Sequence, residues 1–205
     1  MSIDRDRARL LELLRTLSFE RRKVVLASGR ESDFYVDCKR TALTAEGHAL
    51  VGRCLFDRIR GMEPFPRGVG GLTLGADPIA SAVALTSFLE YEKWRAQAQP
   101  DEAAPERVAP RTIDAFVVRK EPKGHGTGQW IEGRKTIPDG SRVVVIEDVV
   151  TTGGSALKAI ERCRAEGLVP VRCLALVDRQ EGGREAIEAA GVPLEALFTR
   201  EDFIR

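Results

Sequence analysis

The sequence predicts an α/β fold in which a parallel central sheet is flanked by helices. Apolar runs of strand length recur along the chain, separated by segments with helical spacing; these runs are 113–118, 143–146, 171–177 and 194–198. Runs that are apolar at nearly every position are typical of strands buried on both faces, as in parallel sheets covered by helices. The 205 residues, 43% of them hydrophobic, are enough for a single core, so we expect one domain spanning residues 1–205.

The first elements are predicted by leucine spacing and by turn residues. Four leucines at helical spacing predict an amphipathic first helix: Leu10, Leu13, Leu14 and Leu17. Two strand-like runs, 24–26 and 34–36, flank the turn sequence of residues 28–30. Thr44 is placed to cap a second helix, because its hydroxyl can accept from the first turn.

The later elements follow from glycine, proline and composition. Gly68–Gly71 should end a short strand, with Asp77 capping a third helix and Pro78 at its first position. From Glu92 to Arg111 the pattern dissolves into alanine, proline and charged residues, which predicts a solvated insertion (92–111) without chemistry. Two further helices are each closed by a glycine: 155–166 before Gly167, and 183–190 before Gly191.

Charge and cysteine usage exclude several classes of protein. A net charge of +1 gives no indication of a nucleic-acid partner or a membrane surface, and no apolar run approaches the roughly 18–20 residues that span a bilayer. The charged N-terminus lacks the apolar core of a signal peptide. The cysteines lack C-x-x-C spacing, and three of them fall among apolar positions, as reduced core residues do: Cys54, Cys163 and Cys173. We therefore expect a cytoplasmic protein with neither nucleic acid nor membrane as partner.

The segment 143–161 carries the most specific chemistry. An apolar strand runs into Glu147 and Asp148, which we expect at its end, followed by the loop 151–155 and a helix. Backbone N–H groups at the positive end of a helix dipole favour a phosphate, and glycines allow the backbone to approach it. Carboxylates accept hydrogen bonds from hydroxyl groups and suit a divalent cation, so a ligand with a ribose diol and a phosphate satisfies both halves. The alternatives are an ordinary turn or a Walker loop, although no Gly-Lys-Ser/Thr follows the glycines.

This segment resembles the phosphoribosyl-pyrophosphate (PRPP) motif of type I phosphoribosyltransferases. The resemblance implies the fold of that family, with a small N-terminal hood (about 1–40) over the site. It also implies that the two acids hold the ribose hydroxyls and that the loop cradles the 5′-phosphate. The implied PRPP-binding residues of the motif are Glu147, Asp148, Val149, Val150, Thr151, Thr152, Gly153, Gly154 and Ser155. Mg²⁺ is the implied cofactor, held mainly through PRPP near the two acids.

A cationic, glycine-rich segment follows the run 113–118. It delivers four cationic or titratable side chains within seven residues: Arg119, Lys120, Lys123 and His125. Like charges this close repel one another, so their clustering suits a polyanion such as pyrophosphate; a solvated basic loop is the alternative. The order RKE-x-K-x-HG resembles the catalytic loop of orotate phosphoribosyltransferases. The resemblance implies that Lys120, Lys123, His125 and Asp148 are catalytic and that all four loop residues bind PRPP. It further implies a homodimer in which Arg119, Lys123 and His125 act on the neighbouring subunit's site.

Three other segments match the same family. Arg179, predicted to be exposed after the strand 171–177, would hold orotate together with Thr151, because an arginine fork suits a carboxylate. Phe34 or Tyr35 would lie near the base, although either could equally be core. The segment 70–78 occupies the position of the pyrophosphate loop.

The match also departs from the family at two positions, Ala27 and Leu74, where many relatives carry lysine. Lys39 and Arg40 are candidates to replace these cations, but spacing does not decide between them. The implied reaction is Mg²⁺-dependent transfer of ribose 5-phosphate from PRPP to N1 of orotate, giving orotidine 5′-monophosphate and pyrophosphate in pyrimidine (UMP) biosynthesis. The alternatives are a type I enzyme for another nucleobase and a non-catalytic PRPP-binding regulator, which would have no need of the cationic loop.

Overall fold

The computed structural model describes residues 2–25, 31–97, 110–122 and 129–204. Its central feature is a six-stranded sheet in the order β5-β4-β3-β6-β7-β8. The strands are β3 (Gly68–Leu72), β4 (Asp114–Val118), β5 (Ile131–Glu132), β6 (Arg142–Val150), β7 (Val169–Asp178) and β8 (Leu194–Thr199). All neighbouring strands are parallel except β5, which pairs antiparallel with β4. The predicted parallel sheet is therefore confirmed, while the two-residue β5 is too short to give a sequence signal.

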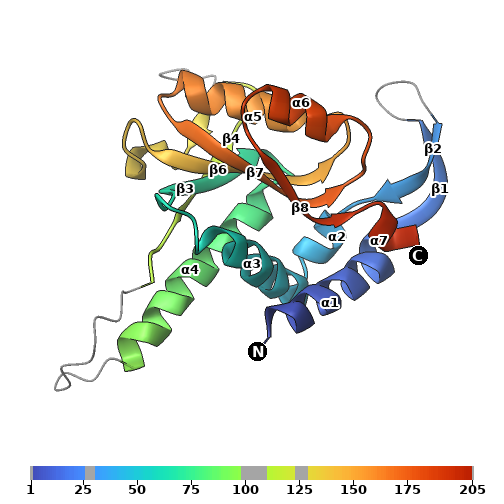
Figure 1. Ribbon diagram of the computed structural model, residues 1–205, viewed down its shortest axis with the longest axis horizontal. Coiled ribbons are helices and arrows are strands. Elements are labelled where there is room, and N and C mark those ends of the chain that lie inside the picture. Colours follow the sequence, from blue (N-terminus) through green and yellow to red (C-terminus); the bar gives the residue numbers. More distant parts are fainter. Residues whose placement is uncertain (1, 26–30, 98–109, 123–128, 205) are drawn as a thin grey trace.

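Helices cover both faces of this sheet (Figure 1). One face carries α1 (Ile3–Leu13), α3 (Ala45–Ile59) and α4 (Asp77–Gln97), and the other carries α5 (Gly154–Ala165) and α6 (Gly183–Ala189). Alternate residues of β6 belong to two separate core clusters, with Val144 and Ile146 in one and Val143 and Val145 in the other. A strand buried on both faces must be apolar throughout, which explains the continuous run at 143–146.

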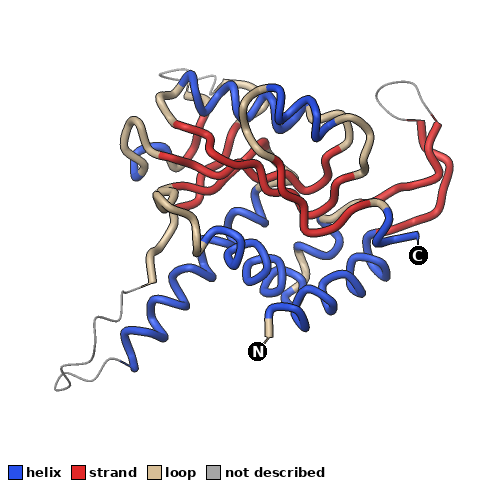
Figure 2. Tube along the Cα trace, in the orientation of Figure 1, coloured by secondary structure: helices blue, strands red, loops and turns tan. Residues whose placement is uncertain are grey.

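The N-terminal portion that follows α1 extends beside the main sheet, near β8 and the C-terminus (Figure 2). After α1 the chain continues as one π-helical turn (Leu14–Ser18), an antiparallel pair of strands, β1 (Phe19–Val25) and β2 (Glu31–Val36), and a short helix α2 (Lys39–Ala42). Phe34 of β2 packs against Phe19 and against Phe203 of the last short helix, α7 (Glu201–Ile204), with ring centroids 5.0 and 5.5 Å apart. This aromatic cluster joins the start of the chain to its end.

The boundaries of two predicted elements were wrong. Helix α4 continues to Gln97, so the first six residues of the expected insertion 92–111 are helical, and Trp94 stacks on Tyr91 one turn earlier. The remainder of the insertion lies outside the described residues except for Pro110 and Arg111. At the other end of α4, Asp77 is the first helical residue rather than the cap, and its Oδ2 accepts the Thr73 hydroxyl at 2.7 Å.

The predicted cap of α3 and the predicted reduced cysteines are confirmed. Thr44 caps α3, its hydroxyl accepting from the Gly47 N–H at 3.0 Å. All four cysteines, Cys38 included, are buried free thiols. Within the described segments, no helix is both long enough and apolar enough to cross a membrane.

Candidate active site

The predicted site lies where the order of the strands reverses. Strand β3 pairs with β4 along its whole length, but with β6 only from Gly68–Val143 to Gly70–Val145. Beyond Val145, β6 runs on beside β7 alone, so β3 and β6 separate toward their carboxyl ends. Because β4 and β6 lie on opposite sides of β3, this is a topological switch point, where open α/β sheets bind ligands.

The acid pair occupies the stretch of β6 that β3 leaves unpaired. Glu147 and Asp148 had been expected at the end of the strand, but β6 continues through Val149 and Val150, which pair with Val177 and Asp178 of β7. The strand continues because one edge of β6 stays paired with β7 through Val150, while its other edge separates from β3 after Val145. Both acids therefore project from a strand fixed along one edge, rather than from a loop.

The two acids differ in their surroundings. Glu147 is 6% exposed and forms no ion pair within the described parts of the chain. Burial, followed by the neighbouring Asp148, raises the pKa of Glu147 to about 9. A carboxyl group with that pKa is protonated at neutral pH and can both donate and accept hydrogen bonds. Asp148 is more open, and its Oδ1 accepts from the Val149 N–H at 2.9 Å.

Two glycines bring the predicted pyrophosphate loop against this strand. A Cβ atom on Gly75 would lie 2.6 Å from Cγ of Asp148, and one on Gly71 would lie 2.1 Å from the Ile146 carbonyl oxygen. Only glycine permits such approaches, so the segment 71–75 rests directly on the acid-bearing part of β6. Leu74, at the tip, is 69% exposed, and Asp77 Oδ1 is buried without a hydrogen-bond partner among the described residues.

The predicted phosphate loop follows β6 directly. Gly153 has a φ of +82°, and a Cβ there would lie 3.0 Å from the carbonyl oxygen of Gly183, at the start of α6. The inner side of the loop is thus held by α6, while Thr152, Gly154 and Ser155 are exposed on its outer side. The first N–H groups of α5 have no partner within their own helix, so the loop presents donors to an anion.

The base of the cationic loop is anchored at both ends. The Arg119 N–H donates to the Trp130 carbonyl at 2.9 Å. The Arg162 guanidinium lies over the Trp130 ring, with its Cζ 3.6 Å from the ring centroid. The Arg119 side chain pairs with Glu132 at 3.1 Å, whereas Lys120 is exposed. Lys123 and His125 fall outside the described residues. The structure thus places the start of the loop at the end of β4, next to β3.

Arg179 is buried rather than exposed, contrary to prediction. Its side chain forms an ion pair with Glu181, in which Nη2 lies 2.9 Å from Oε1. Its guanidinium carbon lies 5.5 Å from the Phe34 ring centroid. Phe34 is buried in the core, which confirms the core alternative for this residue; its place near a base stays a prediction. The Arg179 N–H donates to the Val150 carbonyl at 2.9 Å, which sets the arginine beside the start of the phosphate loop.

Sequence reasoning missed the residues that shape this turn. Asp178 is buried and accepts from the Gln180 N–H at 2.8 Å, while Gln180 takes a left-handed conformation with φ of +57°. Glu181 accepts from Arg179, and its second oxygen is buried without a hydrogen-bond partner in the described structure. In the sequence, these residues look like an ordinary charged turn, because only burial distinguishes them.

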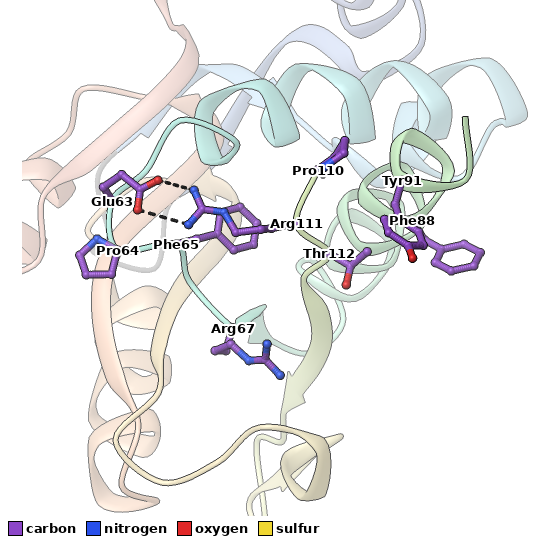
Figure 3. A pocket seen from close by; sticks show the side chains of 9 residues that line it. All are labelled: Glu63, Pro64, Phe65, Arg67, Phe88, Tyr91, Pro110, Arg111 and Thr112. Atoms are coloured by element: carbon purple, nitrogen blue, oxygen red, sulfur yellow. Dashed lines mark hydrogen bonds and ion pairs between the residues drawn. The ribbon is translucent and has the colours of Figure 1, made fainter. Parts of the chain in front are cut away.

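A hollow of about 620 Å³ lies elsewhere, at the amino-terminal end of the sheet (Figure 3). It is lined by Glu63, Pro64, Phe65, Arg67, Phe88, Tyr91, Pro110, Arg111 and Thr112. Arg67 immediately precedes β3 and Thr112 shortly precedes β4, and none of the predicted site residues lines the hollow. It is therefore distinct from the candidate site.

Similarity to known proteins agrees with this geometry. Residues 81–191 match the family model described as phosphoribosyl transferase domain. The orotate phosphoribosyltransferase of Sorangium cellulosum is 50% identical over 199 residues, covering 97% of this chain and 93% of that protein. A crystal structure of Mycobacterium tuberculosis orotate phosphoribosyltransferase in complex with PRPP has a TM-score of 0.71 at 39% identity, covering 97% and 98% of the two chains.

A more distant neighbour carries less weight. Adenine phosphoribosyltransferase from Leishmania donovani has a TM-score of 0.64 at 19% identity, covering 96% of this chain and 82% of that one, which supports the fold alone. The nearly full-length relatives above share both the fold and much of the sequence. The chain therefore belongs to the phosphoribosyltransferase family and, within it, to the orotate phosphoribosyltransferases.

Proposed function

We propose that the chain transfers ribose 5-phosphate from PRPP to N1 of orotate in a Mg²⁺-dependent reaction, giving orotidine 5′-monophosphate and pyrophosphate. The observation that carries the proposal is the meeting of three elements at one switch point: the acid pair, the glycine loop on Asp148 and the open phosphate loop. A relative at 39% identity was solved with PRPP, which supports the same donor here.

Each end of the donor has a matching element. The exposed N–H groups and hydroxyls of Thr151–Ser155 bind the 5′-phosphate at the start of α5. Asp148 accepts from the ribose hydroxyls, and protonated Glu147 donates or accepts beside it. The diphosphate lies toward the segment 71–75, whose glycines let the backbone approach closely. Arg179 and Thr151 hold orotate, with Glu181 keeping the arginine fork in place.

Bond breaking separates charge in a predictable way. As the bond from C1 of the ribose to the diphosphate oxygen breaks, positive charge develops on the sugar and negative charge on the leaving group. Lys120 of one subunit and Arg119, Lys123 and His125 of its partner neutralise the latter, and closure of their loop excludes water from the cationic sugar. Arg119 must exchange Glu132 for the diphosphate in this step, which its half-exposed position permits.

The residues present fit Mg²⁺ held through the donor. Among the described residues, no group of three or more His, Cys, Asp or Glu side chains could hold a metal by itself. Asp148 offers an accessible carboxylate, whereas Glu147 is protonated and a poor ligand until a cation lowers its pKa. Bound there with oxygens of PRPP, the ion would supply neutralisation of the leaving diphosphate.

A homodimer is part of the proposal, and helix α4 suggests the surface. Three of its residues are large, apolar and exposed: Leu85, Phe88 and Leu89. Their spacing of three and four residues puts them on one stripe of the helix. We propose that a second copy of the chain covers this stripe.

The setting of the reaction is also proposed. Orotate as acceptor places the chain in de novo pyrimidine (UMP) biosynthesis, and four buried, uncrosslinked thiols suit a reducing cytoplasm. We further propose that residues 1–205 act as one domain, with the segment 1–40 as its hood.

The proposal is tested by the ultraviolet absorbance change of orotate. Orotate is mixed with PRPP, Mg²⁺ and the protein, and its consumption should be matched by pyrophosphate release. Adenine, hypoxanthine and uracil serve as competing acceptors. Turnover with one of these and none with orotate would reject the substrate assignment while leaving the donor intact.

A further inference from the structure

Lys39, the first residue of α2, reaches from the hood to the acid pair. Its Nζ lies 2.8 Å from Asp37 Oδ1 and 3.8 Å from Asp148 Oδ2, and its side chain remains 42% exposed. The preceding residue supports the same junction, since the buried Cys38 thiol lies 3.7 Å from the Asp148 carbonyl oxygen. The start of α2 is thus fixed against the strand that carries the acids.

Its neighbour Arg40 points elsewhere. Arg40 pairs with Glu20 of β1 and lies 3.9 Å from Asp37 Oδ2, and it forms no ion pair with Asp148 in the described parts of the chain. Of the two cations that sequence spacing left undecided, only Lys39 is at the candidate site. Arg40 instead belongs to the charged surface of the hood.

The surroundings of Lys39 keep it charged and leave it a free donor. Hydrogen bonding to Asp37, with a further contribution from Asp148, raises its pKa despite partial burial. An ammonium group has three donors, and two carboxylates occupy at most two of them. The third is available on an exposed side chain beside Asp148, the carboxylate on which Gly75 of the glycine loop also rests.

We propose that Lys39 contacts substrate, donating to a diphosphate oxygen of PRPP beside the glycine loop. It would thereby supply a cation to a loop whose own tip, Leu74, is an exposed apolar side chain. Asp37 holds the ammonium in place, so the lysine need not be ordered when the ligand binds. This inference rests on the proposed function, because it takes the diphosphate of PRPP as the ligand.

The test is binding of Mg²⁺-pyrophosphate and of Mg²⁺-PRPP to the full-length protein by isothermal titration calorimetry. The variant is Lys39→Met, which keeps the aliphatic stem and removes the charge. Loss of one charge-assisted hydrogen bond should weaken both ligands by about 10-fold or more and reduce the dependence of binding on salt. Lys39→Arg should restore most of the affinity, and orotate KM should change little.

Two controls separate a ligand contact from a structural tether. Arg40→Met removes the adjacent cation of the same helix and should leave pyrophosphate affinity unchanged. Melting temperatures of both variants show whether α2 stays docked. Unchanged pyrophosphate and PRPP affinity in Lys39→Met would overturn the inference, as would equal losses in both variants. Failure of the proposed function would look different: wild-type protein would bind pyrophosphate through Lys39 yet not consume orotate.

Discussion

The two ends of the central sheet differ in the partners that their carboxyl groups have. At the amino-terminal end, Arg111 pairs with Glu63 and lies over the Phe65 ring, 4.7 Å from its centroid, while Arg172 pairs with Glu195 at 2.8 Å. Figure 3 shows Arg111 facing both of its partners. At the carboxyl-terminal end, Glu147 is buried without an ion pair in the described residues, and Asp148 shares one lysine with Asp37.

This difference indicates which end binds a ligand. Exposed, mutually paired charges contribute little to stability and need nothing further. A buried carboxyl group without a cation lowers stability, and such groups persist mainly where a ligand uses them. A hollow of about 620 Å³ lies at the amino-terminal end, away from the acid pair, so a hollow does not by itself identify the active site.

The largest expected effect is from Asp148→Asn. The variant keeps size and hydrogen bonding but removes the charge that we propose faces the ribose and the metal-bearing donor, so turnover should fall by a factor of about 10²–10³ or more. Melting temperature should change little, because Asp148 supports no core packing. A variant that melts much earlier yet keeps its specific activity while folded would show a structural role instead.

Lys123→Ala should lose nearly as much turnover. Removing one donor to the leaving diphosphate typically costs a factor of about 10²–10³. If the loop acts across the dimer, mixing Lys123→Ala with Asp148→Asn subunits should restore activity, because each hybrid contains one site with both parts intact. With half of the dimers hybrid and independent sites, recovery should reach about a quarter of wild type.

Hybrid formation is checked by native mass spectrometry. If hybrids are present and activity is not restored, the loop serves its own subunit, and the assignment of Arg119, Lys123 and His125 in trans is wrong.

A smaller effect is expected from placing charge on the stripe of α4. Leu85→Glu combined with Leu89→Glu should shift the protein toward monomers in analytical ultracentrifugation, because buried like charges oppose the interface. Turnover should fall at low protein concentration and recover partly at high concentration. Val169→Glu, at the amino-terminal end of β7 where the side chain is also half exposed, is the matched control and should leave the sedimentation unchanged.

Glu147→Gln should raise stability while lowering activity. The pKa of about 9 in the fold exceeds the ordinary value of 4.5, so the fold favours the protonated form. The resulting penalty is absent below pH 4.5, grows as pH rises because the unfolded chain ionises first, and levels off above about pH 9. Tm differences measured with EDTA should therefore widen with pH, by about 2–4 °C for each kcal/mol removed. A pH-independent difference would contradict the assigned protonation.

The sequence predicted the parts of the site that have a pattern of their own. The apolar run 143–146, the loop 151–155 and the glycines before α4 correctly predicted a buried strand, the turn into α5 and the close approach of the segment 71–75 to β6, because strand burial and close approach restrict residue type locally. Two predictions failed where the outcome depends on distant parts of the fold. β6 continues past the acids because β7 pairs with it, and Arg179 is buried because Phe34 and Glu181 cover it.

The position of Lys39 was undecided for the same reason. Lys39 and Arg40 are adjacent cations with equal claims in the sequence, and only the docking of α2 against β6 separates them. A contact between residues far apart in the sequence, such as that of Lys39 with Asp148, leaves no periodic pattern in the sequence.

The smallest expected effect comes from the amino-terminal end of the sheet. Arg111→Ala removes the pair with Glu63 and the contact with Phe65, both at the surface. Because exposed ion pairs are screened and hold two long side chains in order, orotate turnover should stay within about twofold of wild type and Tm should fall only slightly. Glu63→Gln, which breaks the same pair from its other side, should behave alike. A large loss of turnover in both variants, with the fold intact by circular dichroism, would mean that the hollow in Figure 3 is functional. The contrast between the two ends of the sheet would then no longer identify the active site.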